Sequence, residues 1–157
     1  MKIKLLCIGK TNFKFIDEGM ELYHSRLKYF IELEQVFIPD IKNTKNMPVD
    51  EIKKKEGQSL LKNIAQGDFV CLLDERGNSF DSEGFAEYIQ KKLEQNIKNL
   101  IFVVGGAYGF SAEIYSRADF KITLSKMTFS HQIIRLFFLE QLYRAFTIIK
   151  GLPYHNQ

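Results

Sequence analysis

The chain has 157 residues, of which 45% are apolar, and a formal net charge of +3. This size suits a single domain, and this composition excludes disordered and fibrous proteins. Cys7 and Cys71 lie inside apolar runs and not at disulfide or metal-ligand spacing, so we expect buried free thiols in a reducing cytoplasm. The opening MKIKLLCIGK is too briefly apolar for a signal peptide, and we expect no membrane span.

The positive charge is concentrated near the end of the chain. Residues 121–157 include five basic side chains and one acidic side chain, so this stretch carries +4 and residues 1–120 carry −1. Such a concentration of charge attracts phosphate, which favours a nucleic-acid partner. The alternative is a solvated helix face followed by a basic tail.

Apolar runs and amphipathic segments alternate along the chain, which predicts strands alternating with helices. The expected strands are residues 2–9, 34–39, 68–73, 100–104 and 120–124, and the expected helices are residues 13–27, 48–67, about 85–93, a short one from about 111, and 129–149. The runs DFVCLL and LIFVV are apolar throughout, as in strands that are buried on both faces of a parallel sheet. We therefore expect one α/β domain over residues 1–157, with a mainly parallel sheet covered by helices.

Three polar or glycine-rich segments follow the later strands. They are LDERG (residues 73–77), GGAYG (105–109) and SKMTFSH (125–131). Ligands of open α/β sheets bind beyond the carboxyl ends of the strands, so a site at this edge is expected.

None of the three segments carries a decisive catalytic signature by itself. GGAYG matches neither a dinucleotide-binding nor a phosphate-binding loop, and a tight structural turn is as good an interpretation as a site. In LDERG, Asp74 and Glu75 are adjacent, so a charged turn is favoured over a catalytic carboxylate pair. Ser125 and Ser130 lack the setting of a hydrolase nucleophile. The scattered histidines and cysteines indicate no metal site.

The final expected helix is apolar around most of its circumference. A helix on the surface of a single sheet needs only one apolar stripe. This excess favours a second packing surface, and we expect a homodimer built on this helix. A central helix within one chain is the alternative.

Taken together, LDERG, FVVGGAYG, LSKMTFSHQIIRLFFLEQLYRAF and the tail PYH resemble the RlmH family, over essentially the whole chain. These are SPOUT-class methyltransferases that methylate N3 of a pseudouridine in 23S ribosomal RNA. The resemblance implies a C-terminal trefoil knot, an obligate homodimer, and assembled ribosomes as the substrate. It also implies S-adenosyl-L-methionine in the knot and requires no metal. The implied cofactor contacts are Leu73, Gly105, Leu124, Ser125, Lys126, Met127, Thr128 and Phe129.

The same resemblance suggests roles for basic and tail residues. Tyr154, His155 and the cofactor-side loop are alternative candidates to assist proton removal from the target base, and Lys126, Arg135 and Arg144 are candidate RNA phosphate contacts. Arg144 lies in an apolar helix, where a structural ion pair is an equal alternative. Two positions depart from the family: Ser130 replaces a proline and can cap the last helix, and Asn156 replaces a basic residue.

Other functions stay open from the sequence. A related SPOUT enzyme that acts on transfer RNA is the nearest alternative, and a non-catalytic ribosome-binding protein is another. A nucleotide-dependent oxidoreductase is disfavoured by the glycine pattern.

Overall fold

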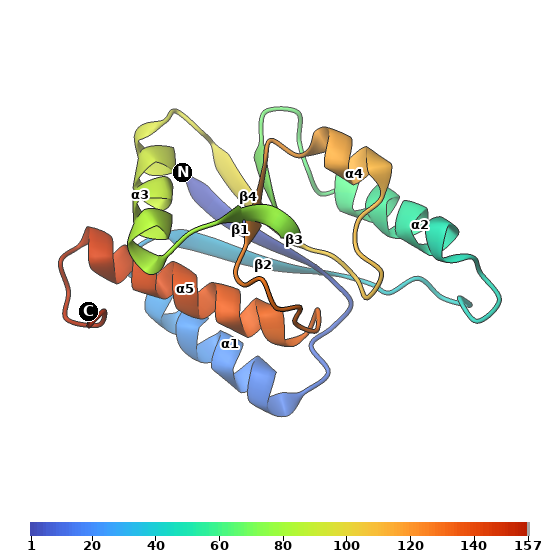
Figure 1. Ribbon diagram of the computed structural model, residues 1–157, viewed down its shortest axis with the longest axis horizontal. Coiled ribbons are helices and arrows are strands. Elements are labelled where there is room, and N and C mark those ends of the chain that lie inside the picture. The colour runs from blue at the N-terminus through green and yellow to red at the C-terminus, as the bar shows by residue number, and fades with distance from the viewer. Residues whose placement is uncertain (157) are drawn as a thin grey trace.

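The computed structural model describes residues 1–156, which form a single α/β domain (Figure 1). Five parallel strands make one sheet in the order β2-β1-β4-β3-β5. The elements in chain order are β1 (Lys2–Ile8), α1 (Lys14–Leu27), β2 (Glu32–Ile38), α2 (Val49–Leu61), β3 (Phe69–Ser79), α3 (Ser82–Glu94), β4 (Asn99–Val104), α4 (Ala112–Arg117), β5 (Phe120–Thr123) and α5 (Ile133–Ile149). The expected class of fold is confirmed.

Helices cover both faces of the sheet. Figure 1 shows α1, α3 and α5 together on one side, with α2 and α4 on the other. Alternate residues of the central strands accordingly enter two separate apolar clusters: in β4, Phe102 joins the cluster under α5 and Val103 joins the cluster under α2 and α4. The sheet is therefore buried on both faces, as its continuous apolar runs predicted.

Helix α5 is the central helix of its layer. It packs on the sheet and also against α1 and α3 at its two sides. These three contacts account for most of its apolar circumference within one chain, as in the central-helix alternative. Phe137 is an exception, because it remains 39% exposed and forms an edge-to-face contact with the exposed Phe129 at a centroid distance of 5.1 Å.

Several element boundaries differ from those expected, and β3 extends to Ser79 where an end at residue 73 was expected. Strand β2 begins at Glu32, and helix α2 ends at Leu61 and not near residue 67. A turn follows α2, in which the Asp68 carboxylate accepts a hydrogen bond from the Ala65 amide at 2.8 Å. Helix α5 begins at Ile133, four residues later than expected, and the Ser130 hydroxyl accepts the Ile133 amide hydrogen at 3.2 Å. Ser130 therefore satisfies one amide of the first turn, although the N-cap residue of α5 is Gln132.

Strand β3 crosses β5 in an unusual way. Ile122 of β5 pairs with Leu73 and again with Asn78. Residues 74–77 therefore leave the ladder and form a bulge opposite Ile122. At the crossing, a Cβ on Gly77 would lie 2.5 Å from the Ile122 carbonyl carbon. Only glycine lets two backbones approach this closely.

Other features of the core agree with the composition. Cys7 and Cys71 are buried free thiols, and burial raises the pKa of each to about 12. No helix within the described residues is long and apolar enough to cross a membrane.

The close approach at Gly77 predicts an effect on the stability of the fold. Gly77→Ala should lower the free energy of unfolding by roughly 1–3 kcal/mol, because the new methyl group must displace the Ile122 backbone. Gly67→Ala is the matched control, since a Cβ at Gly67 meets nothing within 4 Å and should change stability by less than about 0.5 kcal/mol. Urea denaturation of both variants measures the difference. Equal stabilities would show that the crossing is looser than described.

Candidate active site

The carboxyl ends of β3, β4 and β5 open into one cavity of about 580 Å³. LDERG, GGAYG and SKMTFSH all contribute to its lining. This volume lies within the range of small-molecule sites, roughly 300–1,000 Å³. The three segments that the sequence marked are therefore brought together, as expected for this edge of the sheet.

Nearly all the expected cofactor contacts line this cavity. The lining includes Leu73, Gly105, Leu124, Ser125, Met127, Thr128 and Phe129. Lys126 is exposed and is not among the lining residues. Its expected cofactor contact is therefore not formed by the cavity of one chain, whereas its exposure leaves it available to another molecule.

The polar side chains of SKMTFSH shape the segment itself. Ser125 Oγ accepts the Met127 amide hydrogen at 2.9 Å, and the preceding Thr123 hydroxyl donates to the Ser125 carbonyl at 2.6 Å. Short polar side chains satisfy loop backbone groups in this way. Met127, by contrast, is 75% exposed at the cavity mouth and offers an apolar surface to a ligand. The polar residues thus hold a turn, and the apolar ones supply walls.

Arg135 fastens this segment to the sheet. Its side chain is fully buried, at 0% exposure. Its Nε donates to the His131 carbonyl at 2.9 Å, and its two terminal nitrogens donate to the Gly9 carbonyl at 3.1 Å and the Ile8 carbonyl at 2.5 Å. Burial lowers the pKa of this guanidinium. The expectation that Arg135 contacts RNA phosphate is therefore wrong, because its donors serve buried backbone carbonyls.

Gln132 makes a second tie between the same parts of the chain. Its side-chain amide donates to the Lys10 carbonyl at 3.1 Å and accepts the Asn12 amide hydrogen at 2.9 Å. The Gln132 side chain is buried, although both of its partners belong to exposed residues. The start of α5 is therefore fixed to the segment that follows β1.

The first two glycines of GGAYG lie against close packing beneath the loop. A Cβ on Gly105 would lie 3.2 Å from the buried ring of Phe110, and one on Gly106 would lie 2.6 Å from a carboxylate oxygen of Glu56. Glu56 is buried, and this burial, with the charge of Asp40, raises the pKa of its carboxyl. Gly105 has no side chain and so leaves room for Phe110. The tight turn and the candidate site, which were alternative interpretations of GGAYG, therefore lie at the same place.

Sequence reasoning missed several polar residues of the cavity, among them Tyr115 and His131. Tyr115 on α4 donates a short hydrogen bond to the Asp74 carboxylate, whose other oxygen accepts the Arg76 amide hydrogen at 2.8 Å. Burial, with the hydrogen bond to Asp74, raises the pKa of Tyr115 to about 12, so its hydroxyl remains protonated. Burial, with the charge of Arg135, lowers the pKa of His131. The position of His131 within SKMTFSH was the one available signal.

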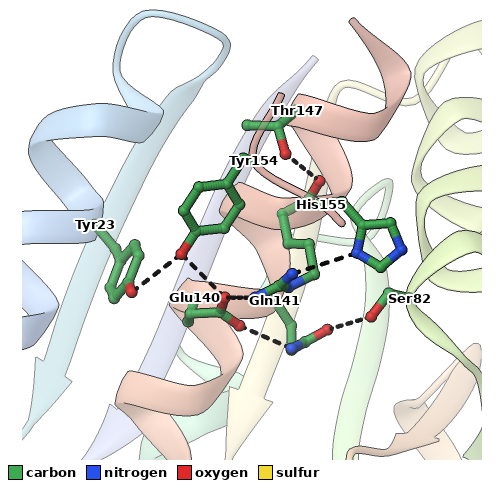
Figure 2. Close-up of polar contacts among 8 residues, drawn as sticks. Tyr23, Ser82, Glu140, Gln141, Thr147, Tyr154 and His155 are labelled. Atoms are coloured by element: carbon green, nitrogen blue, oxygen red, sulfur yellow. Dashed lines mark hydrogen bonds and ion pairs between the residues drawn. The ribbon is translucent and has the colours of Figure 1, made fainter. Parts of the chain in front are cut away.

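Tyr154 and His155 do not line the cavity of their own chain. The cavity lies at the start of α5, whose 17 residues extend about 25 Å, and the tail leaves from its other end (Figure 1). The tail instead folds against α5, where Tyr154 and His155 join a polar network (Figure 2).

Arg144 belongs to this network. Its guanidinium donates to a Glu140 carboxylate oxygen at 2.6 Å and lies over the Tyr154 ring at 5.0 Å from the centroid. Of the two interpretations open from the sequence, the structural ion pair is the one formed.

The fold and this cavity define a parallel α/β protein with a small-molecule site at the carboxyl edge of its sheet. A family model described as "Predicted SPOUT methyltransferase" matches residues 1–155, and the chain belongs to this family of methyltransferases. Within the described residues, no group of histidine, cysteine or acidic side chains is arranged to hold a metal ion.

Relatives match over the full length. The chain is 56% identical to "Ribosomal RNA large subunit methyltransferase H" of Christiangramia forsetii and 50% identical to the protein of that name in Flavobacterium johnsoniae, with all of each chain covered. Among solved structures, "a probable methylase family protein from Haemophilus influenzae Rd KW20" is similar, with a TM-score of 0.57 and 11% identity. That similarity, over 99% of this chain and 70% of the other, supports the fold alone.

The role of Arg135 can be tested by its removal. Arg135→Met should lower the free energy of unfolding by roughly 3 kcal/mol, because three buried carbonyls lose their donor. Lys126→Met is the control, because Lys126 is exposed and should change stability by less than about 0.5 kcal/mol. Chemical denaturation measures both. Unchanged stability in Arg135→Met would contradict the structural role.

Proposed function

We propose that this protein uses S-adenosyl-L-methionine to methylate N3 of a pseudouridine in 23S ribosomal RNA, acting on assembled ribosomes in the cytoplasm. The observation that carries the proposal is the meeting of LDERG, GGAYG and SKMTFSH around one cavity in a chain of the SPOUT family. The shared name of its full-length relatives supports ribosomal RNA of the large subunit as the substrate.

The cavity suits the cofactor in size and chemistry. Leu73, Leu124 and Phe129 offer apolar walls for an adenine ring, and the glycine-rich backbone from residue 105 offers peptide groups at close range. Asp74 also lines the cavity and provides a carboxylate for the cationic part of the ligand. When bound, the cofactor supplies an electrophilic methyl group. The protein must then position the acceptor nitrogen in line with it, and such positioning carries much of the catalysis.

We further propose that the functional unit is a homodimer. Tyr154 and His155, the candidate residues for handling the proton of the target base, are absent from the cavity of their own chain. A second copy placed against the exposed Phe129 and Phe137 near that cavity would cover an apolar surface and bring its tail to the site. The complete active site would then contain the cavity of one chain and the tail of the other.

Lys126 is the candidate RNA contact that the structure leaves available. It is exposed beside the cavity mouth, whereas Arg135 is buried and Arg144 is paired with Glu140. A single exposed ammonium next to the site can contact a phosphate of the target strand.

The threading of the C-terminal stretch through a loop, as in a trefoil knot, is also part of the proposal. Two observations support it: residues 74–77 pass around Ile122 of β5, and Asn78 donates from its side chain to the Lys121 carbonyl at 3.2 Å on the returning side. The chain after β5 then forms the cavity edge and α5.

Cofactor binding is tested by filling the cavity. Thr128→Trp should weaken S-adenosyl-L-methionine binding at least about tenfold, because Thr128 is exposed in the lining and an indole would occupy the space of the ligand. Asn96→Trp adds the same ring at an exposed position outside the lining and should bind as the wild type does. Isothermal titration calorimetry gives both affinities. Equal binding by the two variants would place the cofactor elsewhere.

The substrate is tested in cells and in vitro. Mass mapping of RNA from cells lacking the gene should show one uridine-type base in 23S ribosomal RNA without its methyl group, and the purified protein should restore it on assembled ribosomes. Loss of a methyl group from transfer RNA instead would identify the related transfer-RNA activity. Cofactor-independent ribosome binding with no RNA changed would identify a binding protein.

A further inference from the structure

The tail residues are held in a defined geometry by a network centred on Glu140 (Figure 2). One carboxylate oxygen of Glu140 accepts from Arg144 at 2.6 Å and from the Tyr154 hydroxyl at 3.1 Å. The other accepts from the Gln141 side chain at 2.7 Å, and Gln141 in turn accepts from Ser82 at 3.2 Å. The network therefore connects the tail to α5 and α3.

Tyr154 is committed to this network. Because its hydroxyl donates to Glu140, the contact of 3.3 Å between the Tyr154 and Tyr23 hydroxyls must be donated by Tyr23. The Tyr154 ring also packs edge-on against Tyr143 at 4.8 Å. Burial, followed by the hydrogen bond to Tyr23 and the charge of Glu140, raises the pKa of Tyr154. Tyr154 is thus a positioning residue, because its protonated hydroxyl has no capacity to take up a proton at neutral pH.

His155 is held by Arg144. A terminal nitrogen of Arg144 lies 3.3 Å from Nδ1 of His155. A guanidinium has five donors and no acceptor, so in this contact Nδ1 must be the accepting, unprotonated nitrogen. A neutral imidazole carries its proton on the other nitrogen, which makes Nε2–H the remaining donor of the ring. Figure 2 shows this second nitrogen on the side of the His155 ring away from the contact.

Two helices supply the charged and titratable groups near the tail. Arg144 and Glu140 come from α5, and Tyr23 of α1 lies against the tail with Arg26 over its ring at 5.7 Å. The Glu140 carboxylate accepts two hydrogen bonds on the oxygen that faces Arg144, so the guanidinium is fixed in place. If Nδ1 carried the proton, it would point at a guanidinium donor, and the contact with Arg144 would be lost.

We propose that His155 donates a hydrogen bond from Nε2–H to a carbonyl oxygen next to the ring nitrogen that is methylated, and that it does not act as the base. This inference rests on the proposed function. In a uracil-type ring, N3 lies between two carbonyl groups. When the N3–H bond breaks and its proton passes to solvent water, the negative charge spreads onto both oxygens. A fixed donor aimed at one oxygen stabilises that charge, as in an oxyanion hole.

The remaining electron movements balance without a protein base. The N3 electron pair forms the new N–C bond, and the carbon–sulfur bond of the methyl donor breaks with its electron pair retained on sulfur. His155 keeps its proton throughout. The chain therefore supplies a hydrogen-bond donor and holds it in position, and water receives the proton.

The tautomer is measured directly in the free protein by ¹⁵N nuclear magnetic resonance of neutral imidazoles. We expect His155 to be protonated at Nε2. His24 is an internal standard, because its Nε2 lies 3.1 Å from the Leu33 carbonyl, which can only accept. Arg144→Met should convert His155, but not His24, to a mixture of tautomers. A His155 ring protonated at Nδ1 in the wild type would overturn the proposal, whatever the activity of the protein.

Activity on ribosomes separates a donor from a base. The side-chain amide of His155→Gln can donate near the position of Nε2 but takes up no proton, whereas His155→Ala does neither. We expect His155→Ala to lose roughly a hundredfold or more in rate, as when an oxyanion-hole donor is removed, and His155→Gln to recover most of it. Both should bind S-adenosyl-L-methionine as the wild type does. If His155→Gln is as inactive as His155→Ala, the donor role is wrong. An inactive wild type would instead contradict the proposed function, and the tautomer measurement would still decide the state of His155.

Discussion

The position of the active site depends on one buried cation. Arg135 has no carboxylate partner in its hydrogen bonds and is stabilised by backbone carbonyls from the end of β1 and from His131. Removing an arginine from water is costly unless its donors are paired, so these carbonyls must stay in place around it. The start of α5 is thereby fixed relative to the sheet, and SKMTFSH has to span the interval between β5 and that fixed point.

The second fixed point of the cavity is the crossing of β3 over β5. Residues 74–77 pass around Ile122 at a distance that only Gly77 permits, which sets LDERG opposite SKMTFSH. With GGAYG held over Phe110 and Glu56, all three walls are determined by backbone packing and not by the ligand. A cavity formed in advance saves the free energy of ordering loops when a small molecule binds.

The features that depend on local pattern could be predicted from the sequence. Alternating apolar runs predicted the parallel sheet, and strand ends predicted which segments meet. What failed depended on contacts between distant residues. Arg135 looked like a surface cation because sequence carries no information on the Ile8 and Gly9 carbonyls that surround it. Likewise, α5 begins late because SKMTFSH forms turns of its own, and β3 continues beyond LDERG because it pairs again with β5.

The same contacts change the meaning of the charge pattern. Of the basic residues after residue 120, Arg135 is buried, Arg144 is paired with Glu140, and Lys121 lies over the Tyr115 ring at 5.6 Å. Lys126 and Lys150 remain exposed, so the stretch after residue 120 presents less free positive charge than its sequence suggests. Any phosphate contact made beside the cavity therefore also draws on cations from earlier in the chain, because Arg76 is exposed in its lining and Lys53 is half-buried there.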